Sequence, residues 1–206
     1  MDKYTSTIID NQSFPVINWI NFLFFEKHII LLSSEEYKKM SFRNRYVVTG
    51  SNGVINLSVP LANGRNQRVP FREVKIANSE RWQLTHWRTI TSCYNRSPYF
   101  EYYRDGLEKF FINRWEFLFD WNLSVLEWLK EILKFPAELI VSDKFPGGAE
   151  DLRDKWLPKN FQKDTVVIKY PQMFEDRTGF QNNLSILDML FNVGPKAADL
   201  FMHSSY

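Results

Sequence analysis

The start of the chain contains two short apolar runs separated by a brief segment with helical spacing. Residues 5–9 and 29–32 are rich in aliphatic and β-branched side chains, which is typical of buried strands. A proline-containing loop at residues 11–15 leads into the segment in which Trp19 and Phe22 recur at helical spacing. A strand, a helix and a second strand within about thirty residues are typical of a βαβ unit and predict a parallel sheet.

Two further β-rich runs, residues 45–49 and 54–59, flank the sequence Gly50-Ser51-Asn52-Gly53. An Asn-Gly dipeptide between two such runs is the strongest short-range signal for a hairpin. The pattern therefore predicts a β-hairpin over about residues 45–59. A polar loop then leads to a short β-rich run at residues 72–76, which we expect to be another strand.

Helical periodicity dominates the second half of the chain. We expect helices over about residues 80–93, 101–111, 123–133 and 185–191. Asn78 or Ser79 can cap the first of these helices, and Asp120 and Asn122 can cap the third. Asn192-Val193-Gly194-Pro195 ends the last one. Residues 138–141 and 165–168 are β-rich and bracket a loop-and-helix stretch at 144–163.

This order of elements predicts an α/β protein: a mostly parallel, Rossmann-like sheet with an added hairpin and several packed helices. The chain has 206 residues, no internal repeat and no break in composition. We therefore expect one domain over residues 1–206, which is long enough to bury a core without disulfides or metals. The 18 Phe, 9 Tyr and 7 Trp predict a dense aromatic core, a stacking cleft, or both.

Charge and cysteine content exclude several classes of partner and site. The 26 basic and 24 acidic residues are spread along the chain, so we expect no nucleic-acid partner. Cys93 is the only cysteine, which excludes an internal disulfide and zinc binding by paired cysteines. The three histidines lack metal-ligand spacing, and we expect no metal and no cofactor. The apolar runs are too short for an integral membrane segment, and we expect a cytoplasmic protein; the oligomeric state is left open.

Residues 86–103 combine a histidine, two arginines, hydroxyls and an amide with six large aromatic side chains. Such a mixture is poor core material, because every buried polar tip needs a partner, and it suits a pocket wall. Within it, Tyr94, Asn95, Ser97 and Tyr99 are candidates to stack on a sugar ring and bind its hydroxyls. The alternative is turn chemistry, in which Asn95 and Ser97 satisfy nearby backbone groups.

A second set of candidates comes from the first loop and the start of the hairpin. Gln12 follows the first expected strand, where ligands of parallel sheets bind. Strand alternation would place Arg43 and Arg45 on one face with Asn44 opposite, so two guanidinium groups could clamp a phosphate or carboxylate. The alternative is a solvated strand edge whose charges discourage aggregation.

His86 is the candidate general base, because the pKa of an unperturbed histidine lies near neutrality. On the expected helix it shares a face with Trp82, Ile90 and Cys93, so a hydrogen-bonded core histidine is the alternative. Asp188 lies among apolar residues and needs a partner, either as structural support or as part of the site. There is no glycine-rich phosphate loop, G-x-S-x-G or H-E-x-x-H motif, which disfavours common NTPases, hydrolases and zinc enzymes.

Several blocks, taken in order over about residues 10–196, resemble the WbqC-like protein family. They are Gln12-Ser13-Phe14-Pro15 with Trp19; Tyr37-Lys38-Lys39 through Arg43-Asn44-Arg45; Leu57-Ser58-Val59-Pro60; Trp82…His86…Tyr94-Asn95…Ser97-Pro98-Tyr99-Phe100; and Leu184-Ser185-Ile186-Leu187-Asp188…Leu190-Phe191-Asn192…Gly194-Pro195. Where this chain has Ser13-Phe14, a Pro-x-Tyr-type turn is usual in the family.

The resemblance implies a transferase of bacterial O-antigen or other surface-polysaccharide biosynthesis, which moves a small acyl or aminoacyl group, such as glycine, onto a sugar. Arg43 and Arg45 would then hold an anionic handle such as the phosphate of a nucleotide-sugar. His86 would deprotonate the acceptor, and Tyr94, Asn95 and Tyr99 would orient its ring, supported by Gln12 and Asp188. The alternative is a non-enzymatic module of the same pathway that binds a nucleotide-sugar or a protein partner.

Overall fold

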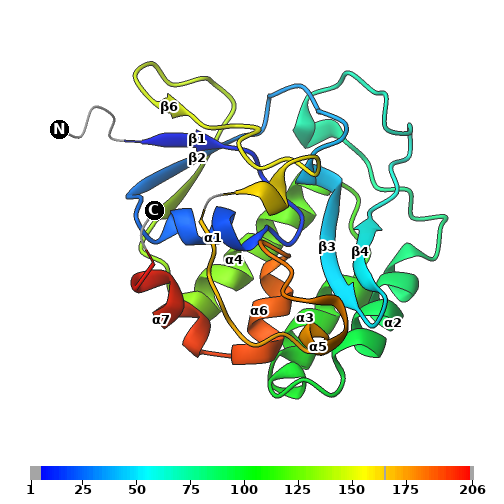
Figure 1. The fold of residues 1–206 in the computed structure, drawn as a ribbon. Helices are drawn as coiled ribbons and strands as arrows, with labels where there is room; N and C mark the ends of the chain where they lie inside the picture. Colours follow the sequence, from blue (N-terminus) through cyan, green and yellow to red (C-terminus); the bar gives the residue numbers. More distant parts are fainter. Residues whose placement is uncertain (1–5, 165, 205–206) are drawn as a thin grey trace.

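The protein is described by a computed structural model that covers residues 6–164 and 166–204. It is an α/β structure with a parallel sheet, a separate hairpin and surrounding helices, as the sequence predicts (Figure 1). Thr5 and Thr165, the first residues of two expected strands, lie outside the described residues.

The parallel sheet consists of β1 (Thr7–Ile9), β2 (His28–Leu32), β5 (Glu138–Ser142) and β6 (Glu150–Asp151), in the spatial order β5-β2-β1-β6. All three strand pairs are parallel. Helix α1 (Ile17–Leu23) connects β1 to β2, which confirms the expected βαβ unit. The chain thus moves outward from β1 through β2 to β5, and then returns to place β6 on the other side of β1.

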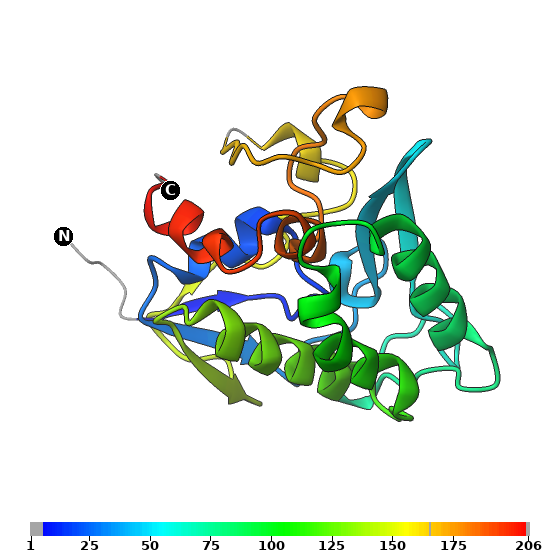
Figure 2. The same ribbon diagram turned by 90° about the horizontal axis from the view of Figure 1, so that it is seen from below.

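The helices of the outward crossovers cover one face of the sheet. Helix α1 and helix α4 (Leu118–Leu133), which precedes β5, lie on the same side of the strands (Figures 1 and 2). Right-handed crossovers that run in the same direction require this arrangement. The return from β5 to β6 passes over the opposite face, where Ile8, Ile30 and Leu32 pack with Ala149. A loop therefore covers the face that a helix covers in many α/β sheets.

The hairpin forms as predicted from β3 (Arg45–Gly50) and β4 (Gly53–Ser58), with Gly50 opposite Gly53. Gly53 adopts a φ of +108°, which a residue with a side chain rarely tolerates. One face of β3 packs against helix α2 (Trp82–Tyr94), where the rings of Tyr46 and His86 are in edge contact.

Helices α2, α3 (Phe100–Ile112), α4 and α6 (Ile186–Val193) confirm the four expected helices. Two short helices, α5 (Glu175–Thr178) and α7 (Lys196–Met202), were not expected. The stop signal does end α6, but Pro195 then serves as the N-cap of α7, because proline is well tolerated where a helix begins.

Three local expectations are wrong. Residues 72–76 form a 3₁₀ turn at Phe71–Glu73 and isolated bridges instead of a strand, since the chain bends to meet α4. The described residues 166–168 form no strand, and β6 occupies the position beside β1. The expected N-caps are also not the observed ones, because Arg81 precedes α2 and Phe117 precedes α4, and neither makes a side-chain cap hydrogen bond. Asn78 and Ser79 lie before Arg81, and Asp120 and Asn122 lie inside α4.

Most of the large aromatic side chains belong to the core. Phe14 is fully buried and makes ring contacts with Tyr46, Phe110, Phe111 and Trp121. These side chains come from the loop after β1, the hairpin and helices α3 and α4. The aromatic cluster therefore joins the sheet half of the molecule to the hairpin half.

Candidate functional site at the carboxyl edge of the parallel sheet

The direction in which strands are added to the sheet reverses at β1, and the carboxyl ends of the parallel strands β1 and β6 lie side by side there. In open parallel sheets, ligands bind in the crevice outside the strand ends at such a reversal. Asp10 follows β1 directly, and Arg153 and Asp154 follow β6 closely. The side chain of Asp10 bridges the two ends, because Oδ1 accepts a hydrogen bond from the backbone N–H of Asp154 at 3.2 Å and Oδ2 accepts one from Gln12 at 3.0 Å.

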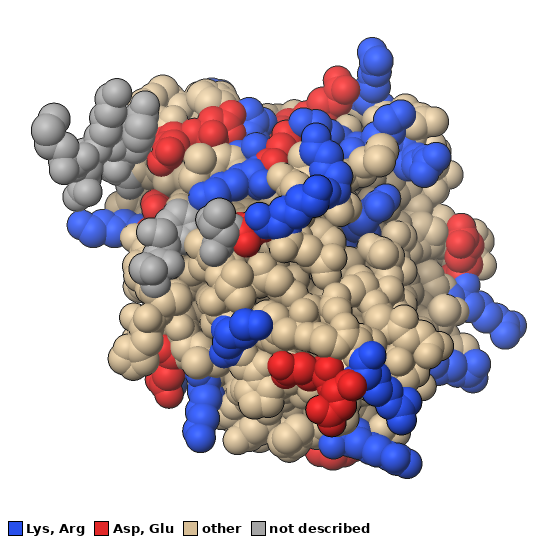
Figure 3. Space-filling model, in the orientation of Figure 1, with Lys and Arg blue, Asp and Glu red and all other residues tan. Residues whose placement is uncertain are grey.

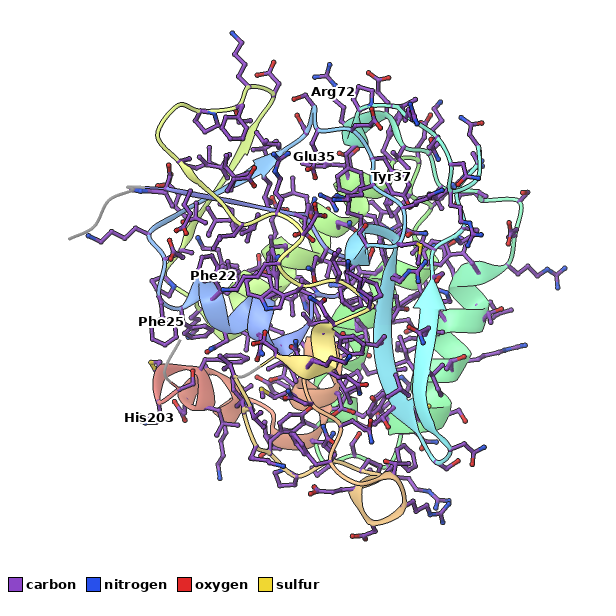
Figure 4. All side chains as sticks on the ribbon, turned by 45° about the horizontal axis from the view of Figure 1, so that its top comes forward. Phe22, Phe25, Glu35, Tyr37, Arg72 and His203 are labelled. Carbon is purple, nitrogen blue, oxygen red and sulfur yellow. The ribbon has the colours of Figure 1, made fainter. Side chains whose placement is uncertain are left out.

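A hollow of about 410 Å³ lies at this edge of the sheet. It is lined by Glu35, Glu36, Lys38, Arg43, Asp151, Arg153 and Asp154. Glu35 and Tyr37, labelled in Figure 4, lie on the loop that follows β2. On the face shown in Figure 3, acidic and basic side chains alternate across the upper part, above a broad band without charges. The hollow thus combines carboxylates with guanidinium and ammonium groups.

Arg43 occupies the centre of this charged cluster and is 1% exposed. Its Nε and Nη2 donate to the two carboxylate oxygens of Glu35, each at 3.0 Å, and its Nη1 lies 3.3 Å from Asp154 Oδ1. Arg153 donates from Nη1 to Glu35 at 3.2 Å and makes a two-pronged contact with Asp151 at 2.7 and 2.9 Å. Two-pronged pairs of this kind fix the orientation of both groups.

The surroundings shift the pKa values of two neighbouring carboxyl groups, those of Glu35 and Asp154, in opposite directions. Burial raises the pKa of Glu35 above its ordinary value, and the positive charge of Arg43 offsets only part of this effect. Burial also acts on Asp154, but the hydrogen bond from Lys38 and the charge of Arg43 outweigh it and lower the pKa of Asp154. A pair of carboxyl groups separated in this way is the pattern of an acid–base site.

Asn122 on α4 holds the loops of this site in place. Its side-chain amide donates to the carbonyl oxygens of Asn11 and Arg43, at 3.0 and 2.8 Å, and its Oδ1 accepts a hydrogen bond from Ser13 at 2.8 Å. Asn122 is fully buried, so these hydrogen bonds satisfy polar groups of the two loops that solvent does not reach. The residue that was expected to cap α4 therefore positions the strand ends.

The structure brings Gln12, Arg43 and Asn44 to this region, but their side chains are buried and already bonded. Arg43 lies in a 3₁₀ turn (Phe42–Asn44), and the strand begins only at Arg45, so the expected alternation of Arg43, Asn44 and Arg45 does not apply. Asn44 accepts from the Tyr37 hydroxyl and donates to the Val59 carbonyl, both at 3.0 Å. Arg45 is half-buried at the start of the hairpin.

His86 lies on α2, where it is buried against the hairpin and is 4% exposed. Its Nδ1 lies 2.9 Å from the hydroxyl of Tyr46, and its ring packs edge-on against Trp82. Burial lowers the pKa of His86 to about 4, and a backbone hydrogen bond at Ser58 reverses only part of this shift. The ring is therefore neutral near pH 7, and it does not line the charged hollow.

Tyr94 and Asp188 form a second buried cluster. The hydroxyls of Tyr94 and Tyr170 donate to the two oxygens of Asp188 at 2.6 and 2.7 Å, and the backbone N–H of Thr49 donates to the Tyr94 hydroxyl at 2.9 Å. Burial raises the pKa of Asp188 to about 6, although both tyrosine hydrogen bonds oppose the shift. This cluster joins α2, α6 and the hairpin.

Asn95, Ser97 and Tyr99 lie in the turn between α2 and α3. The Ser97 hydroxyl donates to the Tyr94 carbonyl, Asn95 is exposed, and the Tyr99 ring packs against the backbone of Gly194. A Cβ atom on Gly194 would lie 2.4 Å from this ring, which explains why a glycine ends α6 there.

The aromatic-polar run at residues 86–103 does contribute to a hollow, but through other side chains. Arg88, Thr89, Ser92 and Cys93 line a cavity of about 610 Å³ together with the hairpin tip and Phe174. The candidate residues of the sequence thus fall into separate groups: the sheet edge, the buried histidine, the buried aspartate and the helix turn.

Sequence reasoning missed Asp10, Glu35, Arg153 and Asp154. Asp10 could have been found, because it follows the first strand at the same edge as Gln12. Glu35 and Arg153 carry no such signal, because they are 118 positions apart and only the sheet order brings them together. Among residues 6–164 and 166–204, no group of three or more His, Cys, Asp or Glu side chains could hold a metal ion.

The comparison with known proteins assigns the chain to a family. The profile of the WbqC-like protein family matches residues 11–167 and 149–200. The chain belongs to the WbqC-like protein family. Within the part of the chain that the structure describes, no helix of this WbqC-like protein is long and apolar enough to cross a membrane.

One curated relative extends over nearly the full length of both chains. "Uncharacterized protein Rv1507c" of Mycobacterium tuberculosis (strain ATCC 25618 / H37Rv) is 22% identical over 228 residues, which cover 93% of this chain and 95% of the relative. No solved structure matches the chain.

Proposed function

We propose that this WbqC-like protein binds a sugar in the hollow at the carboxyl edge of its sheet and transfers a small acyl or aminoacyl group to it. The observation that carries the proposal is the mixture of acceptors and donors around the hollow. A sugar hydroxyl both donates and accepts hydrogen bonds. Asp151 and Glu36 offer acceptors, and Arg153 and Lys38 offer donors, within one small space.

An exposed aromatic ring next to the hollow supports a sugar rather than a simple ion. Phe145 is 56% exposed, and the guanidinium of Arg153 lies 5.7 Å from its ring centroid. A flat apolar ring suits the apolar face of a pyranose, while the neighbouring charges bind its hydroxyls. The surface polysaccharide pathway implied by the family resemblance and the cytoplasmic location expected from the short apolar runs belong to this proposal.

Glu35 is the candidate base of the proposed transfer. It accepts the proton of an acceptor hydroxyl or amine while the oxygen or nitrogen forms a bond to the acyl carbon. The bond between that carbon and the leaving group of the donor breaks, and the leaving group keeps the electron pair. The raised pKa of Glu35 brings it closer to the pH at which a base is most effective. Arg43 holds the carboxylate in a fixed orientation.

The proposal is tested with purified protein, a panel of amino and neutral sugars and activated acyl donors. Replacing Glu35→Gln removes the base, and we expect turnover to fall by about 10²- to 10⁴-fold. Glu116→Gln is the matched control, because Glu116 is an exposed carboxylate that is paired with Lys75 at 2.8 Å and does not line the hollow. Wild-type turnover in the Glu35 variant would contradict the assignment.

Glu35→Gln also leaves Arg43 without its main partner, so the variant is compared with Arg153→Ala, which changes a partly exposed donor. We expect Arg153→Ala to weaken sugar binding, measured by calorimetry, while Arg104→Ala on the exposed pair with Glu101 has no effect. Unchanged sugar affinity in the Arg153 variant would remove the hollow from the proposal.

A non-enzymatic binding module is the second candidate function. The observation in its favour is that both carboxylate oxygens of Glu35 are already engaged by arginines. A carboxylate held in this way suits fixed recognition of a nucleotide-sugar or a protein partner. Under this alternative, the wild type binds the sugar and Arg153→Ala does not. No acyl transfer is measured with any donor.

A further inference from the structure

Strand β5 forms an open margin of the parallel sheet. Its strand partner is β2, and the sheet order ends at β5. In Figure 2, no described helix or strand lies beyond β5. An edge strand presents unpaired backbone N–H and C=O groups, and natural proteins usually protect such a margin.

The hydrogen bonds of β5 show which of its backbone groups point outward. The N–H of Glu138 donates to Lys27 at 2.8 Å, and the carbonyl of Ser142 accepts from Ser33 at 2.9 Å. Because the two sides of a strand alternate, residues 138, 140 and 142 direct their backbone groups toward β2. Leu139 and Val141 therefore direct theirs toward solvent.

The margin has one of the usual protections against pairing, a charged side chain at Glu138, the first residue of the strand. The strand reads Glu-Leu-Ile-Val-Ser, with no lysine and no proline, and its register with β2 is continuous without a bulge. Ile140 is 36% exposed and Val141 is 46% exposed. An apolar, regular and exposed edge of this kind favours association through added strand pairing.

We propose that β5 pairs antiparallel with β5 of a second copy of this chain, around a two-fold axis at Ile140. In this register Leu139 of one copy faces Val141 of the other, and each such pair exchanges both of its hydrogen bonds. All outward groups of Leu139 and Val141 in both copies are then satisfied. The two sheets become one continuous sheet twice as wide.

The side chains are compatible with this register. Ile140 lies opposite its own copy, so two exposed apolar side chains cover each other. Glu138 lies opposite Ser142, and no like charges are directly paired. The residues that follow Ser142 in one copy lie near Glu138 of the other copy, and they are one acid, Asp143, and one base, Lys144. A second copy presents the same outward groups at Leu139 and Val141 and the same exposed Ile140, so the two-fold axis matches each outward donor with an acceptor and each exposed apolar side chain with another. The proposal does not rest on the proposed function.

A register-specific cross-link tests the proposal on the full chain. In a Cys93→Ser background, the variant Ile140→Cys places its two thiols in a non-hydrogen-bonded pair with Cα atoms about 4.5 Å apart, which a disulfide can join. We expect a disulfide-linked dimer on mild oxidation. The matched variant Val141→Cys faces Leu139 and not its own copy, and we expect it to cross-link much less. Equal cross-linking of the two variants, or none, would overturn the register.

Sedimentation velocity over a range of concentrations tests the association itself. Leu139→Pro removes an outward N–H that the monomer does not use, and proline is tolerated in an edge strand on this side. We expect this variant to remain folded, judged by circular dichroism, and monomeric where the wild type dimerises. Ile112→Lys on α3, which changes another exposed apolar residue, should leave the dimer intact. A wild type that stays monomeric at all concentrations, or a Leu139→Pro variant that dimerises normally, would refute the proposal.

Discussion

At the scale of single residues, the partners of a carboxyl group set its charge state. Asp154 lies beside Lys38 and Arg43, which lower its pKa, whereas Asp188 is fully buried and has only neutral tyrosine hydroxyls as donors. Two hydroxyl donors compensate a buried charge less well than a cation does. The same residue type therefore serves two purposes: Asp154 takes part in an ion pair, and Asp188 locks three elements together.

The raised pKa of Asp188 predicts a pH-dependent stability. Its pKa is about 6 in the folded protein, above the ordinary value of about 3.9 that we expect in the unfolded chain. The folded state thus binds the proton more tightly, and the stabilising contribution is complete below the unfolded pKa and is lost as the pH rises through the folded pKa. This contribution amounts to about 3 kcal/mol.

The measurement is urea unfolding of the wild type and Asp188→Asn at several pH values between about 4 and 7. The side-chain amide of the variant does not titrate, so the contributions of all other groups to the pH dependence of stability cancel in the difference between the two proteins. We expect the stability of the wild type relative to the variant to decrease as the pH rises. A difference that is constant or increases with pH would contradict a raised pKa.

At the scale of elements, helix ends show where local sequence and structure disagree. Helix α4 ends at Leu133, and its C-cap residue Lys134 adopts a left-handed conformation with a φ of +55° and a ψ of +35°. This conformation is frequent at helix ends, but glycine is the residue that adopts it without steric cost. The exposed lysine at this position therefore carries a small conformational penalty.

Replacing Lys134→Gly should stabilise the protein by about 0.5–1 kcal/mol. For a chain of this length, we expect the melting temperature to rise by about 2 °C, measured by calorimetry. Lys134→Ala is the control, because it keeps the Cβ atom and removes only the charged side chain. Equal stabilisation by alanine would show that the backbone conformation is not the cause.

At the scale of the whole molecule, a few buried side chains connect segments that are far apart in sequence. Asn122 joins the loop after β1 and the turn before β3 to helix α4, and both loops contribute to the candidate site. The shape of the hollow therefore depends on a residue that does not line it. Polar networks of this type specify a single arrangement when every member is satisfied.

Replacing Asn122→Ala leaves the carbonyl groups of Asn11 and Arg43 without this donor. We expect the free energy of unfolding to fall by about 3 kcal/mol, measured by chemical denaturation. Asn113→Ala is the control, because Asn113 is exposed at the end of α3 and its loss should cost less than about 0.5 kcal/mol. A similar loss in both variants would mean that the network is not the cause.

Local patterns in the sequence determined the hairpin, the strands β1, β2 and β5 and the helices α2, α3 and α4. These elements follow from apolar periodicity and turn residues within about ten to fifteen positions. Such local patterns do not depend on contacts with distant segments. Their order also predicted the α/β class. Strand β6 could not be predicted, because Glu150–Asp151 has no strand-like composition and pairs only where β1 offers a free side.

The tertiary structure alone decided which polar residues meet. Arg43 was a candidate to bind a ligand, yet it is paired with Glu35 and with Asp154, which is 111 positions away. His86 was a candidate base, yet the hairpin buries it against Tyr46. The energy of a charge or a polar ring depends on burial and partners, and these are set by the sheet order and not by neighbouring residues in sequence. The sequence by itself therefore determined most of the helices and strands, and the fold decided the chemistry at the carboxyl edge of the sheet.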